Sequence, residues 1–336
     1  MFRPLSILTA AIALAGPAVA QSSDASGSAD SGSSQSQPFT AEEINEADYA
    51  GDALPEDQSP FTARLQVLLD RAGASPGVID GWDGENVEKA VLAVEEMNGL
   101  EADGRMDEDV WDALESQTGD AFVRHTISED DVSRIVASLP QDYAELAELD
   151  WLGYTSAAEK IAERFHMDID FLKLLNPDTD FEAVGTEIWV ADPGDDAQPE
   201  IARLVADKSL ARLLAYDEGD KLVLSYPVTI GSDELPSPSG THEVAAVAVE
   251  ASYSYRPGKN FQQGDNEEPL TLPPGPNGPV GSVWIDLSEP TYGLHGSPEP
   301  AEIDKSASHG CVRMTNWDAM EQARAVETGV PVEFRD

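Results

Sequence analysis

Apolar positions along the chain recur at helical spacing in one region and in short runs in another. Between about residues 59 and 114 they fall on single helical faces, and turn-rich segments at 77–81 and 102–105 separate those faces. The two clearest faces comprise Phe61, Leu65, Leu68 and Leu69, then Val87, Ala90, Val91, Val94 and Met97. With a short apolar segment around Trp111, this pattern predicts a unit of three helices.

From about residue 200 the pattern changes to short apolar runs that are rich in Leu, Val and Tyr. These runs span residues 201–216, 221–228, 242–249 and 283–287. Turn-forming residues separate them, as in Asp217-Glu218-Gly219-Asp220, which predicts a hairpin. We therefore expect a mostly β domain, with one helix near residues 316–326.

Between these regions the pattern is mixed. Ser128 can cap a helix that carries Val132, Ile135 and Val136 and that Pro140 ends. A strand edge, two helices and a final strand are expected afterwards, at about 154, 156–165, 169–175 and 185–190. The sequence thus predicts a helical connector followed by a small α/β module.

The N-terminal residues have a different composition. Arg3 precedes an apolar run from Leu5 to Leu14, and small residues precede a cleavage site after Ala20, which is the pattern of a secretory signal peptide. Residues 21–57 contain no Lys or Arg and few large apolar groups, so we expect a disordered acidic tether. The predicted division is 1–20 signal peptide, 21–57 tether, 58–117 three-helix unit, 118–193 connector and α/β module, and 199–336 mostly β domain.

The charge balance excludes some partners. The chain has 20 Lys and Arg against 64 Asp and Glu. Nucleic acids and anionic lipid surfaces are bound through basic patches, so neither is an expected partner. No segment after the signal peptide is apolar for long enough to span a bilayer. We expect an exported, periplasmic protein.

The single cysteine, Cys311, is informative in an exported protein. Cysteines in an oxidising compartment usually pair in disulfides, so a lone one is either a buried structural residue or a reactive thiol. A redox role is a poor fit, because no second cysteine can resolve a disulfide.

The residues around Cys311 favour a reactive thiol. A catalytic cysteine needs an imidazole to accept its proton, a group that orients the imidazole, and backbone donors for an oxyanion. His309 and Gly310 precede Cys311 directly, and His295 with Gly296 lies sixteen residues upstream. Two histidines beside a thiol could in principle hold Zn²⁺, although a fourth ligand is not apparent.

These residues carry a resemblance to a known family. His295-Gly-Ser-Pro-Glu-Pro and Ser308-His-Gly-Cys-Val-Arg-Met-Thr-Asn-Trp-Asp strongly resemble the catalytic domain of L,D-transpeptidases of the YkuD type, over about residues 200–334. The resemblance implies a mostly β sandwich or barrel and attack by the thiol on the amide between the third residue of a peptidoglycan stem and its terminal D-alanine. It implies no cofactor and no metal.

The resemblance also implies roles for individual residues. Cys311 is the nucleophile, His295 the general base, and the backbone at Gly296 the group that orients the imidazole. Ser308 and His309 are expected to orient the nucleophile, and Gly310 and Cys311 to offer oxyanion-hole N–H groups. The candidate substrate-binding residues are Arg313, Trp284 and Tyr292.

Some of these assignments leave alternatives open. Arg313 could pair with a substrate carboxylate or be a structural salt-bridge partner, and Trp284 and Tyr292 could line the cleft or belong to the core. Asp304 stands where relatives often have glycine, which could reshape the loop before Ser308.

Two further segments resemble wall-binding modules, so the fold class expected for the whole chain is multidomain α+β. Residues 58–117 resemble a three-helix peptidoglycan-binding domain, through Gly77-Val-Ile-Asp-Gly81 and Trp111 among others. Residues within 118–193 are similar to a LysM module, through Asn176-Pro177 and the Gly-Thr-x-Ile-x-Val end. A spacer or a packing subdomain is the alternative for each.

Together these features predict a cell-wall-associated L,D-transpeptidase that binds peptidoglycan. Its acyl acceptor could be a stem amine, giving 3–3 cross-links, or a protein amine. With water as acceptor the same site is a carboxypeptidase or endopeptidase. A non-catalytic peptidoglycan-binding protein is the alternative from another class.

Overall fold

The computed structural model describes residues 39–336 except 52, 118, 232–235, 260, 307 and 309. The expected signal peptide and residues 21–38 of the expected tether lie outside the described residues. The chain divides into two units, 1–37 and 38–336, and the description below concerns the second. Among its described helices, none is long and apolar enough to cross a membrane.

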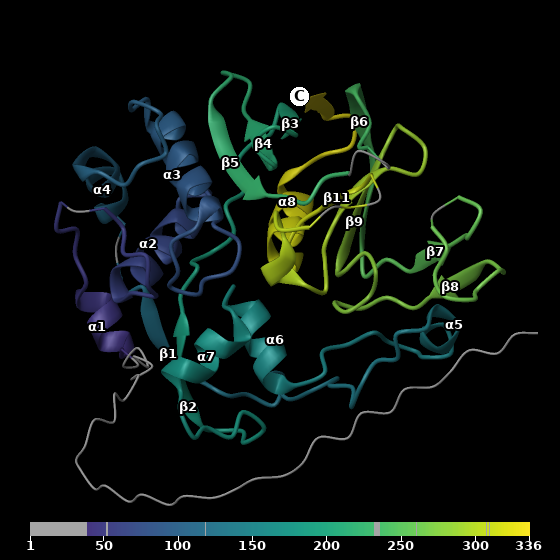
Figure 1. Ribbon diagram of the computed structural model, residues 1–336, viewed down its shortest axis with the longest axis horizontal. Coiled ribbons are helices and arrows are strands. Elements are labelled where there is room, and N and C mark those ends of the chain that lie inside the picture. The colour runs from purple at the N-terminus through teal and green to yellow at the C-terminus, as the bar shows by residue number, and fades with distance from the viewer. Residues whose placement is uncertain are drawn as a thin grey trace, which may run out of the picture. The chain divides into compact units, whose positions relative to one another are not determined.

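The C-terminal region is built on a curled eight-stranded sheet with the strand order β11-β10-β9-β6-β12-β3-β4-β5. Its strands are β3 (Arg203–Asp207), β4 (Arg212–Tyr216), β5 (Leu222–Pro227), β6 (Gly240–Val249), β9 (Val283–Leu287), β10 (Gly293–His295), β11 (Val312–Arg313) and β12 (Pro331–Arg335). Helix α8 (Asn316–Ala325) begins at Thr315, whose side chain accepts the Asp318 N–H, and packs on β9 and β10 (Figure 1). The buried core contains Leu204, Ile285, Leu294 and Ala319, all of which are fully buried. The mostly β fold expected for this region is confirmed.

The three predicted helices of the N-terminal region are α2 (Pro60–Arg71), α3 (Glu85–Asn98) and α4 (Glu108–Glu115). They share one apolar cluster with the sheet, in which Leu65 and Val87 accompany Leu214 and Leu222. The chain after α2 also pairs with the outer strand: the Ser75 N–H donates to the Ser225 carbonyl at 2.9 Å. This pairing satisfies backbone groups that an edge strand would otherwise expose.

A β-α-α-β module follows, made of β1 (Phe122–Thr126), α6 (Ala157–Arg164), α7 (Ile169–Leu175) and β2 (Glu187–Ala191). β1 pairs antiparallel with β2, with Phe122 opposite Ala191. The first strand therefore lies at 122–126 and not near residue 154, where we expected it. Residues 127–155 form an extension between β1 and α6, with one short helix, α5 (Tyr143–Leu146).

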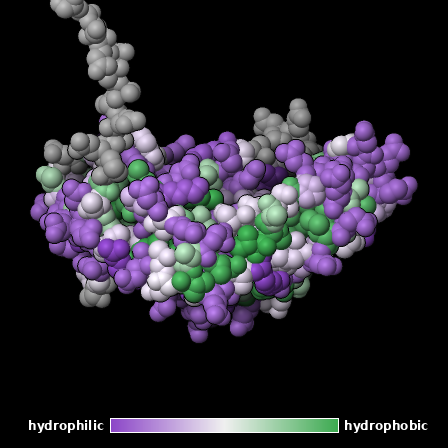
Figure 2. Space-filling view, turned by 90° about the horizontal axis from the view of Figure 1, so that it is seen from below, coloured by the Kyte–Doolittle hydropathy of each residue, from purple (hydrophilic) through white to green (hydrophobic). Residues whose placement is uncertain are grey.

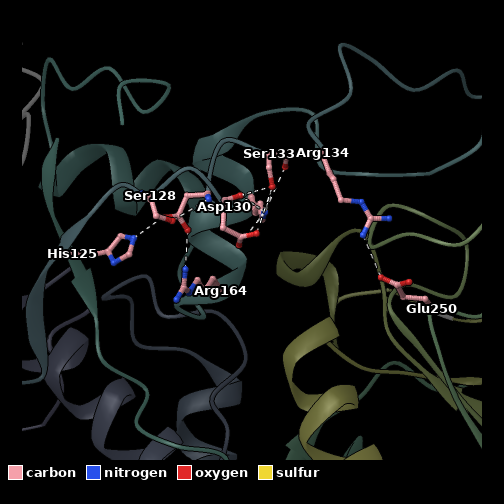
Figure 3. A network of polar contacts seen from close by, with 9 residues as sticks. His125, Ser128, Asp130, Ser133, Arg134, Arg164 and Glu250 are labelled. Carbon is pink, nitrogen blue, oxygen red and sulfur yellow. Dashed lines mark hydrogen bonds and ion pairs between the residues drawn. The ribbon is translucent and has the colours of Figure 1, made fainter. Parts of the chain in front are cut away.

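The helix expected after Ser128 is absent, and residues 129–134 form turns instead. The buried Asp131 carboxylate accepts both the Ser128 N–H (2.8 Å) and the Ser128 hydroxyl (2.7 Å), and it also contacts His125 and Arg164. Figure 3 labels Ser128, His125 and Arg164 in this polar network. These local side-chain bonds hold the backbone in a turn. Arg134 then adopts a left-handed φ of 57°, which a helix does not allow.

Part of the expected tether is ordered. Helix α1 (Ala41–Glu46) begins with a capping box between Thr40 and Glu43. Ile44 is fully buried, and Phe39 packs on Phe171 with ring centroids 6.0 Å apart. The prediction of disorder is therefore wrong for this segment, because the helix buries apolar side chains against the β-α-α-β module.

The surface agrees with the acidic composition. On the face shown in Figure 2, hydrophilic side chains dominate and apolar ones form a narrow band.

Candidate active site

The sheet brings Cys311 and His295 to one pocket. β10 ends at His295, and β11 pairs with it in parallel so that His295 lies opposite Arg313. Cys311 directly precedes β11. Both residues line a pocket of about 380 Å³, which Ser308, Arg313, Trp284 and Tyr292 also line.

The imidazole of His295 is held from two sides. Its Nδ1 lies 2.7 Å from the Gly296 carbonyl oxygen, which assigns the proton to Nδ1 and leaves Nε2 as an acceptor. The Trp284 ring stacks on the imidazole with centroids 5.6 Å apart. Trp284 therefore contacts the expected base as well as lining the pocket.

Asn316 packs against the peptide at Gly296, and sequence reasoning gave it no role. A Cβ at Gly296 would lie 2.1 Å from Asn316 Oδ1, so only glycine fits there. Asn316 Oδ1 accepts the Ser282 N–H at 2.9 Å, and its Nδ2 donates to both oxygens of Glu163 at 3.1 Å. Asn316 lies within the motif that follows Cys311, and that position is the only sequence signal that could have indicated it.

Both reacting side chains are neutral at neutral pH. Burial lowers the pKa of His295 to about 4, against the effect of the Gly296 hydrogen bond, and the Arg313 charge lowers it further. Burial also raises the pKa of the Cys311 thiol, which the Arg313 charge partly offsets. The imidazole is therefore available as a base, and the thiol needs one.

The loop before Cys311 is fixed by hydrogen bonds. The Ser308 hydroxyl donates to the Cys311 carbonyl at 2.5 Å and accepts the Gly310 N–H at 3.1 Å. Gly310 has a φ of 106°, and a Cβ there would lie 2.8 Å from the Tyr292 ring. The Gly310 N–H, expected in an oxyanion hole, is thus engaged with Ser308 in this structure. His309 lies outside the described residues.

Arg313 is available to a ligand. Within the part of the chain that the structure describes, no carboxylate pairs with its guanidinium. In the same described residues, no group of three His, Cys, Asp or Glu side chains is arranged to hold a metal ion.

Comparison with known proteins agrees with this site. Residues 201–334 match the family profile of the L,D-transpeptidase catalytic domain, YkuD. Residues 201–334 are a YkuD-type L,D-transpeptidase catalytic domain. Residues 58–114 match the profile of a putative peptidoglycan binding domain, so the resemblances of the catalytic domain and of the three-helix unit are confirmed, and the likeness of residues 118–193 to LysM stays a prediction. Together the two domains indicate peptidoglycan as the substrate.

Several curated proteins are similar to this chain. A putative L,D-transpeptidase YkuD of Bacillus licheniformis is 29% identical over 176 residues, which cover 52% of this chain and 92% of that protein. The probable L,D-transpeptidase YbiS of Escherichia coli K12 is 26% identical over 191 residues, 55% of this chain and 61% of that protein. This chain thus spans less than two thirds of YbiS.

Solved L,D-transpeptidase structures are also similar to parts of this chain. An L,D-transpeptidase from Mycobacterium smegmatis has a TM-score of 0.34 at 16% identity, over 46% of this chain and 65% of that one. An Enterococcus faecium L,D-transpeptidase mutant has a TM-score of 0.31 at 20% identity, over 40% of this chain and 50% of that one.

The L,D-transpeptidase domain does not form its pocket alone. Tyr143, from helix α5 of the preceding module, lines the pocket together with Tyr253, Lys259 and Phe261. Sequence reasoning missed all four, because none lies near the cysteine motif.

Asp304 has a backbone conformation that favours glycine. Its φ is 67°, a left-handed value that glycine adopts without strain. Its carboxylate lies 2.7 Å from Lys89 Nζ on α3 of the peptidoglycan-binding domain. A side chain at this position thus ties the loop between His295 and Ser308 to that domain.

Proposed function

We propose that this protein is an exported enzyme that cross-links peptidoglycan stems through a thioester on Cys311. The observation that carries the proposal is the pair of Cys311 and His295 in one pocket, with His295 Nδ1 bound to the Gly296 carbonyl. This arrangement supplies a nucleophile and an oriented base, which acyl transfer to a thiol requires.

In the first step, His295 Nε2 accepts the thiol proton as Cys311 Sγ attacks the carbonyl carbon of the third stem residue. The bond to the nitrogen of D-alanine breaks, the leaving amine takes the proton from His295, and a thioester remains on Cys311. In the second step an amine attacks the thioester and gives its proton to His295. The new amide forms, and the thiol is restored.

The other pocket residues have separate tasks in this scheme. The Cys311 N–H stabilises the oxyanion, and the Gly310 N–H joins it when the Ser308 hydroxyl releases it. Arg313 binds a carboxylate of the stem, because a guanidinium pairs with a carboxylate through two hydrogen bonds. The unpaired state of Arg313 among the described residues supports this role.

The acceptor amine belongs to a second stem, which gives a 3–3 cross-link, or to a protein that becomes attached to the wall. Residues 58–117 and the LysM-like module bind glycan near the cleft. The β-α-α-β order of that module supports its likeness to LysM, and the leader sequence supports export to the periplasm.

The test uses residues 21–336 and the Cys311→Ala variant with tetrapeptide muropeptides, followed by mass spectrometry. We expect dimers formed with loss of D-alanine, and none with the variant. If only shortened monomers form, the protein is a hydrolase that uses the same thiol and not a transpeptidase. Unchanged substrate with folded, reduced protein would refute catalysis and favour a wall-binding protein.

A further inference from the structure

The extension formed by residues 127–155 leaves the LysM-like module and reaches the catalytic domain. In Figure 1, α5 lies directly beneath the hairpin of β7 (Tyr253–Tyr255) and β8 (Leu270–Leu272). These two strands form a sheet of their own. A two-stranded hairpin is only marginally stable without a partner, so what packs against it decides whether it is ordered.

The extension supplies the hairpin with its apolar partner. Leu146 and the fully buried Leu152 form one cluster with Tyr255 and Leu272, which are also fully buried. These four residues make up the buried part of that cluster, and half of them come from the extension. The hairpin therefore depends on residues outside the catalytic domain for its burial.

Polar contacts fix the extension at both ends. At one end the Tyr143 N–H donates to Gln263 Oε1 at 3.2 Å, and Gln263 Nε2 donates to the Gln141 carbonyl at 2.9 Å. At the other end the Leu152 N–H donates to the Pro274 carbonyl at 2.9 Å. A Cβ at Gly275 would lie 2.1 Å from the Leu152 carbonyl oxygen, so the two backbones meet at a distance that only glycine permits.

At the first of these ends the Tyr143 side chain lines the pocket. It packs edge-on against Tyr255 and Phe261, with ring centroids 5.2 Å and 6.0 Å away. Tyr143 is half-buried and shares the pocket with Cys311 and Arg313. An aromatic face with one hydroxyl suits the aliphatic chain and amide groups of a stem peptide, whose carboxylate Arg313 would hold.

We infer that Tyr143 is a specificity-determining residue of the transpeptidase cleft, supplied by the LysM-like module and held in place by the packing of residues 139–152 on the β7–β8 hairpin. The inference rests on the proposed function only for the identity of its ligand, a peptidoglycan stem peptide. The wall-binding module and the catalytic domain thus form the substrate site together.

The experiment compares the full chain with Tyr143→Ala and Tyr143→Phe. Tyr49→Ala is the matched control, because Tyr49 is also half-buried and packs on an aromatic ring, with a centroid distance of 5.9 Å to Phe61, outside the cleft. We expect Tyr143→Ala to raise KM for tetrapeptide muropeptides about tenfold with kcat within about twofold, as loss of an aromatic contact predicts. Tyr143→Phe should restore most of the affinity, and Tyr49→Ala should change neither constant.

A binding measurement separates this inference from the proposed function. The affinity of the tetrapeptide stem is measured in the Cys311→Ala background with and without Tyr143→Ala, where no turnover is needed. An enzyme that binds the stem through Tyr143 but converts nothing would refute the proposed function and keep the inference. Equal affinity and equal KM in the Tyr143→Ala and control proteins would overturn the inference, whatever the turnover.

Hydrogen exchange tests the packing by a separate route. Leu152→Ala should speed amide exchange in residues 253–272 at least tenfold and leave exchange in β3 and β4 unchanged. If the hairpin amides keep their protection, the extension does not hold the hairpin. Circular dichroism of each variant shows that the rest of the fold is intact.

Discussion

The thiol of Cys311 should react as a neutral group and not as part of a preformed ion pair. Burial raises its pKa above the ordinary value of 9.0, and burial lowers the pKa of His295 to about 4. At pH 7 a thiol with a pKa of 9 or more is at most about 1% thiolate. Both shifts favour the uncharged forms, so the neutral thiol and imidazole should predominate over a thiolate–imidazolium pair.

This expectation is tested by measuring the rate at which iodoacetamide alkylates Cys311 at a series of pH values. Mass spectrometry of the intact chain gives the alkylated fraction. Because only the thiolate reacts, the rate should rise about tenfold for each pH unit between pH 6 and 8. Arg313→Gln should lower the rate at each pH, since the Arg313 charge lowers the thiol pKa. The urea-unfolded chain gives the reference rate for an exposed thiol.

Enzymatic turnover should depend on pH in a different way. His295 must be neutral to accept the thiol proton, so turnover should be lost as pH falls through about 4 and be retained above about 5. The alkylation experiment can refute the neutral thiol and imidazole on which both expectations rest. If alkylation is fast and its rate does not change between pH 5 and 7, Cys311 is a thiolate paired with a protonated imidazole.

Three further predictions concern buried or paired charged side chains. The buried Arg212 guanidinium bridges backbone carbonyls of the catalytic and peptidoglycan-binding domains, so Arg212→Leu should lower the free energy of unfolding in urea by about 3 kcal/mol. Asp304→Ala should be about 1 kcal/mol less stable than Asp304→Gly, because both lose the ion pair with Lys89 but only alanine keeps the strained φ of 67°. Burial raises the pKa values of Glu163 and Glu321 from 4.5 to about 7, so the folded state favours their neutral forms and its stability should fall as pH rises from about 4.5 to about 7. Thermal melts across that range should show a smaller pH dependence for Glu321→Gln, and an unchanged slope would contradict the assignment.

Local patterns predicted the parts of the fold that local residues determine. The run at 283–287 coincides with β9, and the helix near 316–326 with α8, because alternation, caps and Gly or Pro boundaries act over a few residues. Cys311 and His295 were predicted as a pair because the motif around them is specific. Even α1 had a local signal, the Thr40 and Glu43 capping box, within a composition that suggested disorder.

Features that depend on distant partners could not be predicted in the same way. β1 pairs with β2 across an extension, so nothing local marks residues 122–126 as the first strand of the module. Ser128 can cap a helix, but here Asp131 takes its hydroxyl and N–H and forms a turn. Tyr143 lies far from the cysteine motif in sequence, and only the packing of the extension places it in the pocket.

The orientation of the catalytic base links these modules most directly. The Gly296 carbonyl that holds His295 Nδ1 belongs to a peptide that Asn316 contacts, and Asn316 Nδ2 donates to Glu163 of the β-α-α-β module. Glu163 is held in turn by the Tyr154 hydroxyl at 2.6 Å. If the chain were cut at residue 199, Asn316 would lose this carboxylate partner and the pocket would lose Tyr143. The β-α-α-β module and its extension therefore contact both Asn316, which packs against the peptide that orients the base, and the pocket itself. Their attachment to the catalytic domain is part of how the site is built.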